Sequence, residues 1–197
     1  MTVAAPDLSA ELEKIGTLEQ LQALCRELFI PEPGELLVFG EGPERSRLLL
    51  IGEAPGEKEA ESGRPFVGNA GRLLDKYLQK AGIRREEAYL TNVLKTRPPG
   101  NRTPRASEVQ EALPVLLRQI ELIRPAIIVC LGSIALHATV DRKAKITEKR
   151  GVWLEKDGMR IMPAFHPSAV FRDEQKRELL KQDLAAAAAA LREQGDG

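Results

Sequence analysis

The chain has 197 residues, 43% of them hydrophobic, and its 29 basic residues balance 29 acidic ones. This length suits one medium-sized α/β domain with a substantial core, and zero net charge excludes a global attraction to nucleic acid, so such a partner would need a local basic patch. The lack of any run of about 18 apolar residues excludes a membrane span and a membrane partner.

The N-terminus and the cysteines indicate the compartment. Residues 1–16 lack the basic and apolar regions of a signal peptide. Cys25 and Cys130 are the only cysteines, and two cysteines so far apart in an unsecreted chain are expected to be reduced thiols. We therefore expect a cytoplasmic protein, and we expect it to be a monomer.

Residues 1–34 are expected to form an N-terminal helical segment. Thr17 and Gln20 have the spacing of a capping box and predict a helix that reaches about Phe29. The sequence PEPGE at 31–35 then breaks the helix. The apolar face of this helix would carry Leu18, Leu21, Leu24, Cys25 and Leu28.

Strands and helices alternate through the core at 35–184. Apolar or strand-like runs lie at 36–39, 48–51, 88–94, 126–132 and in a short stretch from 159. Helices are predicted at 69–82, from a Ser107 cap to Ile123, at 133–140 and at 173–194, with residues 185–197 as the last helix end and tail. This order predicts one domain over 1–197, an α/β fold with a central parallel sheet of about four strands flanked by helices on both faces.

The ends of the predicted strands carry the candidate binding residues. Ligands of such sheets bind beyond the carboxyl ends of the strands, which here are 52–54, 91–92, 131–132 and 165–167. Glycine turns of the kind at 52–56 usually cradle phosphate through backbone N–H groups. However, four carboxylates near this turn would repel a phosphate: Glu53, Glu57, Glu59 and Glu61.

Each candidate residue also has a structural interpretation. Asn92 could be a turn residue bonded to its own backbone, or an amide that offers a donor and an acceptor to a ligand. His166, one of two histidines, could be structural, and Phe66 could be core or could stack on a planar ligand. The basic loop at 95–105 could be a solvated face or could contact a phosphate backbone.

Four motifs together resemble one family. They are GEAPG at 52–56, GRPFVGNAGRLLD at 63–75, YLTNVLKTRPPGNRTP at 89–104 and FHPSAV at 165–170. In this order they resemble the family 4 uracil-DNA glycosylases, from about Phe39 to about Leu184. The resemblance implies a DNA repair hydrolase that flips uracil out of DNA and hydrolyses its N-glycosidic bond, leaving an abasic site. A neutral uracil ring would also tolerate the acidic rim of the glycine turn.

The resemblance implies a role for each motif residue. Phe66 would stack on uracil, Asn92 would recognise its edge, and His166 would donate a hydrogen bond to O2 as negative charge grows there. Glu53 would orient water or stabilise the cationic sugar, which makes Glu53, Asn92 and His166 the catalytic residues. The full uracil-binding set would be Gly52, Glu53, Ala54, Gly56, Phe66, Asn92 and His166. The DNA-binding set would be Lys95, Arg97, Asn101, Arg102, Ser168, Phe171 and Arg172.

The sequence departs from the family in its cysteines. Family 4 members usually hold a four-iron–four-sulfur cluster on four cysteines, and only Cys25 matches such a position here. Gln22, Thr96 and a position near Glu111 take the other three places, and one thiolate cannot hold a cluster. We therefore expect no cofactor and no metal. In its place, the helix from Thr17 is expected to pack against the helix from Ser107, close to Thr96.

The alternative to an active uracil-DNA glycosylase is a catalytically weak or inactive member of the family that binds uracil-containing or damaged DNA.

Overall fold

The computed structural model describes residues 8–193. The predictions about a signal peptide and about the C-terminal tail fall wholly or partly on residues outside this part. A five-stranded sheet has the order β2-β1-β3-β5-β4. Its strands are β1 (Leu48–Gly52), β2 (Ala88–Asn92), β3 (Ile127–Leu131), β4 (Leu154–Lys156) and β5 (Met159–Ala164). The first four in spatial order are parallel, and β4 pairs antiparallel with β5. The parallel α/β prediction is therefore confirmed, with one extra antiparallel edge strand.

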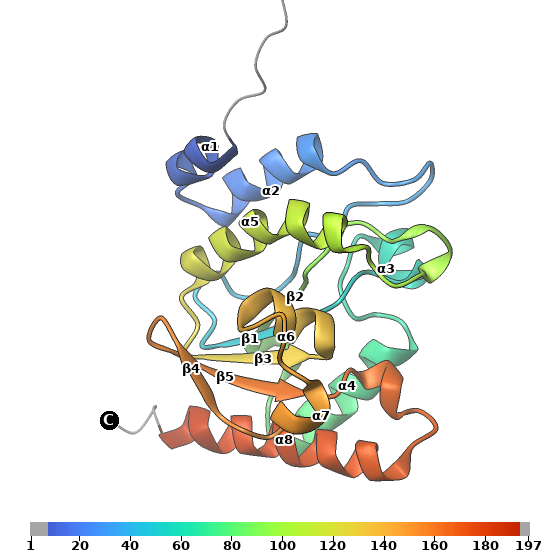
Figure 1. Ribbon diagram of the computed structural model, residues 1–197, viewed down its shortest axis with the longest axis vertical. Helices are drawn as coiled ribbons and strands as arrows, with labels where there is room; N and C mark the ends of the chain where they lie inside the picture. The colour runs from blue at the N-terminus through green and yellow to red at the C-terminus, as the bar shows by residue number, and fades with distance from the viewer. Residues whose placement is uncertain (1–7, 194–197) are drawn as a thin grey trace, which may run out of the picture.

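Helices cover both faces of this sheet, as predicted. Figure 1 shows α2, α5 and α6 on one face and α4 and α8 on the other. The main helices are α1 (Leu8–Lys14), α2 (Leu18–Leu28), α4 (Asn69–Ala81), α5 (Ala106–Ile123), α6 (Ser133–Thr139) and α8 (Glu174–Glu193). Short helical turns are α3 (Glu57–Ser62), α7 (Ile146–Lys149), η1 (Arg85–Glu87), η2 (Pro99–Asn101) and η3 (Pro167–Val170).

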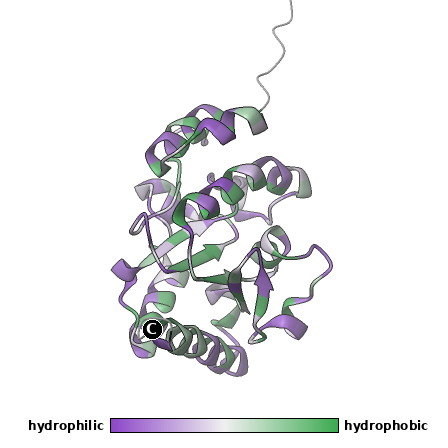
Figure 2. Ribbon diagram, turned by 90° about the vertical axis from the view of Figure 1, so that its left-hand side faces the viewer, coloured by the Kyte–Doolittle hydropathy of each residue, from purple (hydrophilic) through white to green (hydrophobic). Residues whose placement is uncertain are grey.

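The strands are buried on both faces because they lie between these helical layers. Along β1, Leu49 and Ile51 join the core under α2, α5 and α6, while Leu48 and Leu50 join the core under α4 and α8. Figure 2 accordingly shows hydrophobic strands between helices that combine hydrophobic and hydrophilic residues. Continuous apolar runs are typical of such parallel strands, which is why the sequence predicted them well.

Several local elements differ from the prediction. The apolar run at 36–39 lies outside the named strands, with Leu36 N–H bonded to Ala60 O and Val38 N–H to Lys95 O. Helix α3 and strand β4 were missed because each is short. The Asp157–Gly158 pair, with φ of 52° and 76°, forms the β4–β5 turn, and Asp-Gly is a known hairpin signal.

The first helices confirm the predicted packing in most details. Thr17 Oγ1 caps α2 by accepting from Gln20 N–H, and α2 packs against α5, with Cys25 fully buried in the shared core. Leu28 was expected on the apolar face of α2, but it is 40% exposed. Helix α5 begins at Ala106 rather than after a Ser107 cap, because the Glu108 carboxylate accepts from Arg105 N–H.

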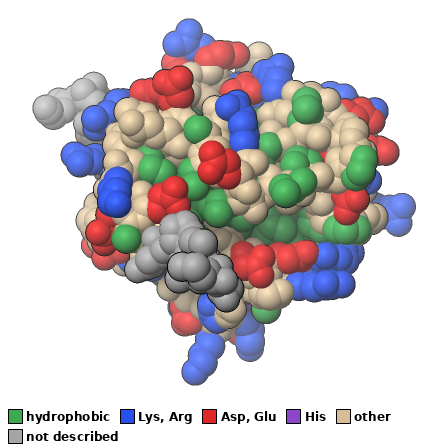
Figure 3. Space-filling view, turned by 90° about the horizontal axis from the view of Figure 1, so that it is seen from above, with side chains coloured by type: hydrophobic (Ala, Val, Ile, Leu, Met, Phe, Trp, Pro, Cys, Tyr) green, Lys and Arg blue, Asp and Glu red, His purple; other side chains and the backbone are tan. Residues whose placement is uncertain are grey.

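The surface has no predominant sign of charge on the side drawn in Figure 3, where acidic and basic side chains are interspersed around hydrophobic ones. This agrees with the zero net charge of the sequence. Among residues 8–193, no helix is long and apolar enough to cross a membrane.

Candidate active site

Three of the parallel strands, β1, β2 and β5, end at a common cavity of about 340 Å³. This volume lies near the lower end of the range of about 300–1,000 Å³ that is usual for ligand pockets. The cavity is lined by Glu53, Ala54, Pro55, Gly56, Glu59, Phe66, Ala70, Asn92, Pro98, Asn101, Arg102, His166 and Ser168. Six of the seven residues predicted to bind uracil line it directly, and the seventh, Gly52, lies behind two of them.

Asn92 ends β2 with its side chain at the wall of the cavity. The residue is only 2% exposed, and it lies beside Gly52 in the register of β1 and β2. Its backbone carbonyl accepts from Lys95 Nζ at 2.8 Å, but its side-chain amide has no hydrogen-bond partner within the described part of the chain. Neither amide atom is fully enclosed by protein, so the amide reaches the cavity and is free to pair with a ligand there.

Gly52 lets Asn92 and Phe66 approach each other. A Cβ atom at Gly52 would lie 2.3 Å from Asn92 Oδ1 and 2.5 Å from Phe66 Cζ. Real Cβ atoms do not come so close to other heavy atoms. The glycine therefore provides the space in which the amide and the aromatic ring meet, and this explains its place at the strand end.

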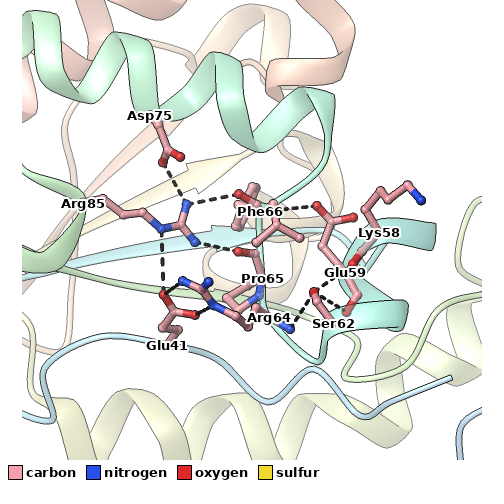
Figure 4. A network of polar contacts seen from close by, with 10 residues as sticks. Glu41, Lys58, Glu59, Ser62, Arg64, Pro65, Phe66, Asp75 and Arg85 are labelled. Carbon is pink, nitrogen blue, oxygen red and sulfur yellow. Dashed lines mark hydrogen bonds and ion pairs between the residues drawn. The ribbon is translucent and has the colours of Figure 1, made fainter.

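The loop between α3 and α4 presents Phe66 to the cavity. Phe66 is 5% exposed and has a φ of 53°, in the left-handed region that bulky residues rarely adopt. Its ring centroid lies 6.3 Å from that of His166, with an interplanar angle of 32°. Sequence reasoning missed Glu59, whose buried carboxylate accepts from the N–H groups of Val67 (2.9 Å) and Gly68 (2.7 Å), as Figure 4 shows in part.

His166 precedes the turn η3 at the end of β5. Burial lowers the pKa of its imidazole to about 4, although the nearby Glu59 acts in the opposite direction. The Ser168 backbone N–H donates to Nδ1 at 3.2 Å, and a backbone N–H can only donate. The ring is therefore neutral near pH 7 with its proton on Nε2, which makes Nε2 a hydrogen-bond donor.

Glu53 is the acidic residue at the end of β1. Its side chain is partly buried at the cavity wall, and this burial raises the pKa of its carboxyl. Its backbone carbonyl accepts from Leu94 N–H at 3.1 Å, which ties the loop after β1 to the loop after β2. Glu53 therefore contributes a carboxyl of raised pKa to the wall of the cavity.

The prediction that Lys95 contacts DNA is wrong. The residue is 1% exposed, and its ammonium donates to Thr91 Oγ1 (2.7 Å), Asn92 O (2.8 Å) and Gln119 Oε1 (2.7 Å). These bonds use all three of its protons, and burial lowers the pKa of Lys95 to about 7. The sequence could not show this, because Gln119 comes from the distant helix α5.

The other residues expected at the DNA lie around the mouth of the cavity or in the loops beside it. Arg97 donates to Glu35 Oε1 at 2.7 Å and Arg102 to Glu108 Oε2 at 2.8 Å, so both guanidinium charges are partly compensated. Asn101 accepts from Arg97 Nε and is exposed. After β5, the three predicted residues Ser168, Phe171 and Arg172 are exposed.

The side chains near Thr96 do not fit an iron–sulfur cluster. Burial raises the pKa of Cys25 to about 11 and that of Cys130 to about 12, so both remain protonated thiols rather than thiolate ligands. Cys130 lies in β3 and contacts Thr139 Oγ1. No group of three or more His, Cys, Asp or Glu side chains suited to a metal ion occurs among residues 8–193.

Comparisons with known proteins agree with this geometry. The family model of the uracil DNA glycosylase superfamily matches residues 39–192. The type-4 uracil-DNA glycosylase of Thermotoga maritima is 44% identical over 165 residues, covering 81% of this chain and 85% of that protein. The type-4 enzymes of Archaeoglobus fulgidus and Pyrobaculum aerophilum are each 40% identical, covering 81% and 75% of this chain and 84% and 80% of their own lengths. The chain therefore belongs to the uracil-DNA glycosylase superfamily, in its type-4 branch.

Proposed function

We propose that this protein excises uracil from DNA by hydrolysing the bond between the base and the deoxyribose, leaving an abasic site. The observation that carries this proposal is the Asn92 amide, which lines the cavity beside the Phe66 ring and has no hydrogen-bond partner among residues 8–193. An amide next to an aromatic ring can bind the edge of a planar base that carries both a donor and an acceptor. Membership of the type-4 branch supports the same substrate.

The residues of the cavity supply each part of the reaction. The Phe66 ring stacks on the extruded uracil, while the Asn92 amide donates to O4 and accepts from N3–H, a pattern that cytosine lacks. Gly52, Ala54 and Gly56 bring the backbone close to the pyrimidine. As the bond from the sugar breaks, negative charge grows on uracil O2, and the His166 Nε2–H donates to it. Glu53 orients the attacking water or stabilises the positive charge of the sugar.

The surface around the cavity holds the DNA strand. Arg97, Asn101 and Arg102 approach the phosphates on one side, and Ser168 binds a phosphate on the other. Phe171, which is 43% exposed, and Arg172 lie where a wedge would fill the gap left by the extruded nucleotide. The whole chain acts as one domain and, we propose, as a cytoplasmic monomer.

Excision is tested directly with a labelled oligonucleotide that contains one uracil. Incubation with the protein, followed by alkali, is expected to cut the strand at the uracil position, because alkali cleaves abasic sites. The same oligonucleotide with cytosine should remain intact. Binding of the uracil strand without cleavage would contradict the proposal and would favour the weak or inactive binder.

His166 is expected to make stability depend on acid pH. An unfolded histidine binds a proton as the pH falls through 6.5, but the folded ring does so only near pH 4. The unfolded state therefore binds more protons in this window, so the stabilisation from the neutral ring is complete above 6.5 and is lost as the pH falls toward 4. In urea titrations, the wild type should lose up to about 1.4 kcal/mol per pH unit more than His166→Gln across this window. Parallel losses in both proteins would contradict the lowered pKa.

We also propose that the protein works without an iron–sulfur cluster. The purified protein should be colourless and should lack stoichiometric iron, because the neighbours of Thr96 include no thiolate. Cys25→Ala should retain excision and lower the free energy of unfolding by about 1 kcal/mol, as for a small core truncation. Stoichiometric iron and sulfide in anaerobically purified protein, or collapse of Cys25→Ala, would contradict this proposal.

A further inference from the structure

Phe66 adopts a backbone conformation that its own side chain does not favour. Its φ of 53° is in the left-handed region, where Cβ crowds the backbone. Such conformations persist only where the surroundings hold the residue firmly, and they concentrate at ligand sites. The groups that hold this loop therefore determine where the aromatic ring lies.

Polar contacts hold every residue of the loop from Arg64 to Gly68. The Arg64 guanidinium binds both oxygens of Glu41 at 2.7 Å. Further along, the Glu59 carboxylate accepts from the last two N–H groups of the loop. The carbonyls of Pro65 and Phe66 between them both accept from Arg85.

Arg85 is the centre of this network, as Figure 4 shows. Its Nη2 donates to Pro65 O at 2.7 Å and its Nη1 to Phe66 O at 3.1 Å. Asp75 from α4 accepts from the same Nη1 at 2.8 Å, and Glu41 lies 3.9 Å from Nε. With carboxylates on two sides, the 17% exposed side chain has little freedom to turn away.

Helix α4 packs closely against this loop and restricts its backbone conformation. A Cβ atom at Gly71 would lie 1.9 Å from Phe66 O, so the helix presses directly on the carbonyl that Arg85 binds. Arg85 itself is not part of the cavity wall. It therefore cannot contact a bound base, and any effect on the base must pass through the loop.

We propose that Arg85 is a positioning residue, which holds the Phe66 ring in the place where it stacks on the extruded base by binding the carbonyls of Pro65 and Phe66. This role rests on the proposed uracil excision. The planar guanidinium is essential to it, because a fork of two nitrogens can reach two successive carbonyls while a third contact fixes its orientation. A residue that only stabilised the fold would not change how tightly the cavity binds a base.

A double-mutant cycle separates these roles. Single-turnover excision of uracil and inhibition by free uracil base are measured for wild type, Arg85→Gln, Phe66→Ala and the double variant. In the wild-type background, Arg85→Gln should lower the excision rate about tenfold and raise the uracil concentration needed for inhibition about tenfold. In the Phe66→Ala background, each quantity should change by less than about twofold. Arg84→Gln is the matched control: Arg84 is the adjacent arginine, its side chain is 77% exposed, and it pairs with Glu87. It should leave both quantities unchanged.

The outcomes distinguish the two proposals. Equal losses from Arg85→Gln with and without Phe66, or a lower melting temperature with unchanged uracil inhibition, would overturn the positioning role alone. A wild type that does not release uracil would overturn the proposed function and this role with it. If Arg85→Gln does not fold, Asp75→Asn replaces it in the cycle, since this change removes the carboxylate that orients the guanidinium and keeps its size.

Discussion

Asn92→Ala is expected to reduce the single-turnover rate of uracil excision by about 10²–10³-fold, the loss typical of removing one placed hydrogen-bonding group from a transition-state site. The amide lines the cavity and has no other partner among the described residues, so its removal leaves O4 and N3–H of the bound base without their protein partner. The backbone contact of residue 92 with Lys95 Nζ does not depend on the side chain, so the fold should be retained.

Binding to undamaged DNA is the control for this variant. That binding uses the surface around the cavity and not the base pocket, so Asn92→Ala should retain it to within about twofold. Asn101→Ala, at an exposed asparagine of the cavity rim that we propose approaches the phosphates, should instead weaken DNA binding and leave inhibition by free uracil base unchanged. An Asn92→Ala enzyme that excises uracil within a few-fold of wild type would show that another group recognises the base.

Gly52→Ala is expected to reduce excision by at least about 10²-fold, although the change adds only one methyl group. The new Cβ would lie 2.3 Å from Asn92 Oδ1 and 2.5 Å from Phe66 Cζ, so both side chains must move. A displacement of about 1 Å in a reacting group can cost about 10²-fold in rate. Overpacking of this kind should also lower the free energy of unfolding by about 1–3 kcal/mol, which urea titration measures.

Gly16→Ala provides the matched control, because the nearest atom to its Cβ would be Gln20 Oε1 at 3.8 Å. That variant should retain full activity and stability. Crystals of Gly52→Ala should show the Phe66 ring or the Asn92 amide displaced from the cavity. Unchanged excision by Gly52→Ala would mean that the cavity tolerates a wider separation of these two groups than we propose.

The sequence predicted the fold correctly where many neighbouring residues carry the same structural signal. Strands such as 48–52 and 127–131 are buried on both faces, so every position must be apolar and the run is easy to recognise. Helix α4 ends at Gly82, whose φ of 81° follows the αL capping rule, and glycine at this place predicted the boundary. Short elements such as α3 and β4 have too few residues to show a period.

The sequence alone also predicted most of the polar residues that line the cavity, although not Glu59, because polar groups at the ends of parallel strands must meet at one edge of the sheet. Only the tertiary structure showed what each of them contacts. Lys95 was expected to be a surface cation in a basic loop, yet α5 supplies Gln119 and the residue is buried. Arg85, which the sequence did not single out, binds the Phe66 loop. Chain order limits which strand ends come together, but hydrogen bonds between residues distant in sequence form only when separate elements pack. For this reason the pattern predicted which residues meet at the cavity, and the fold decided which side chains line it and which hold the others in place.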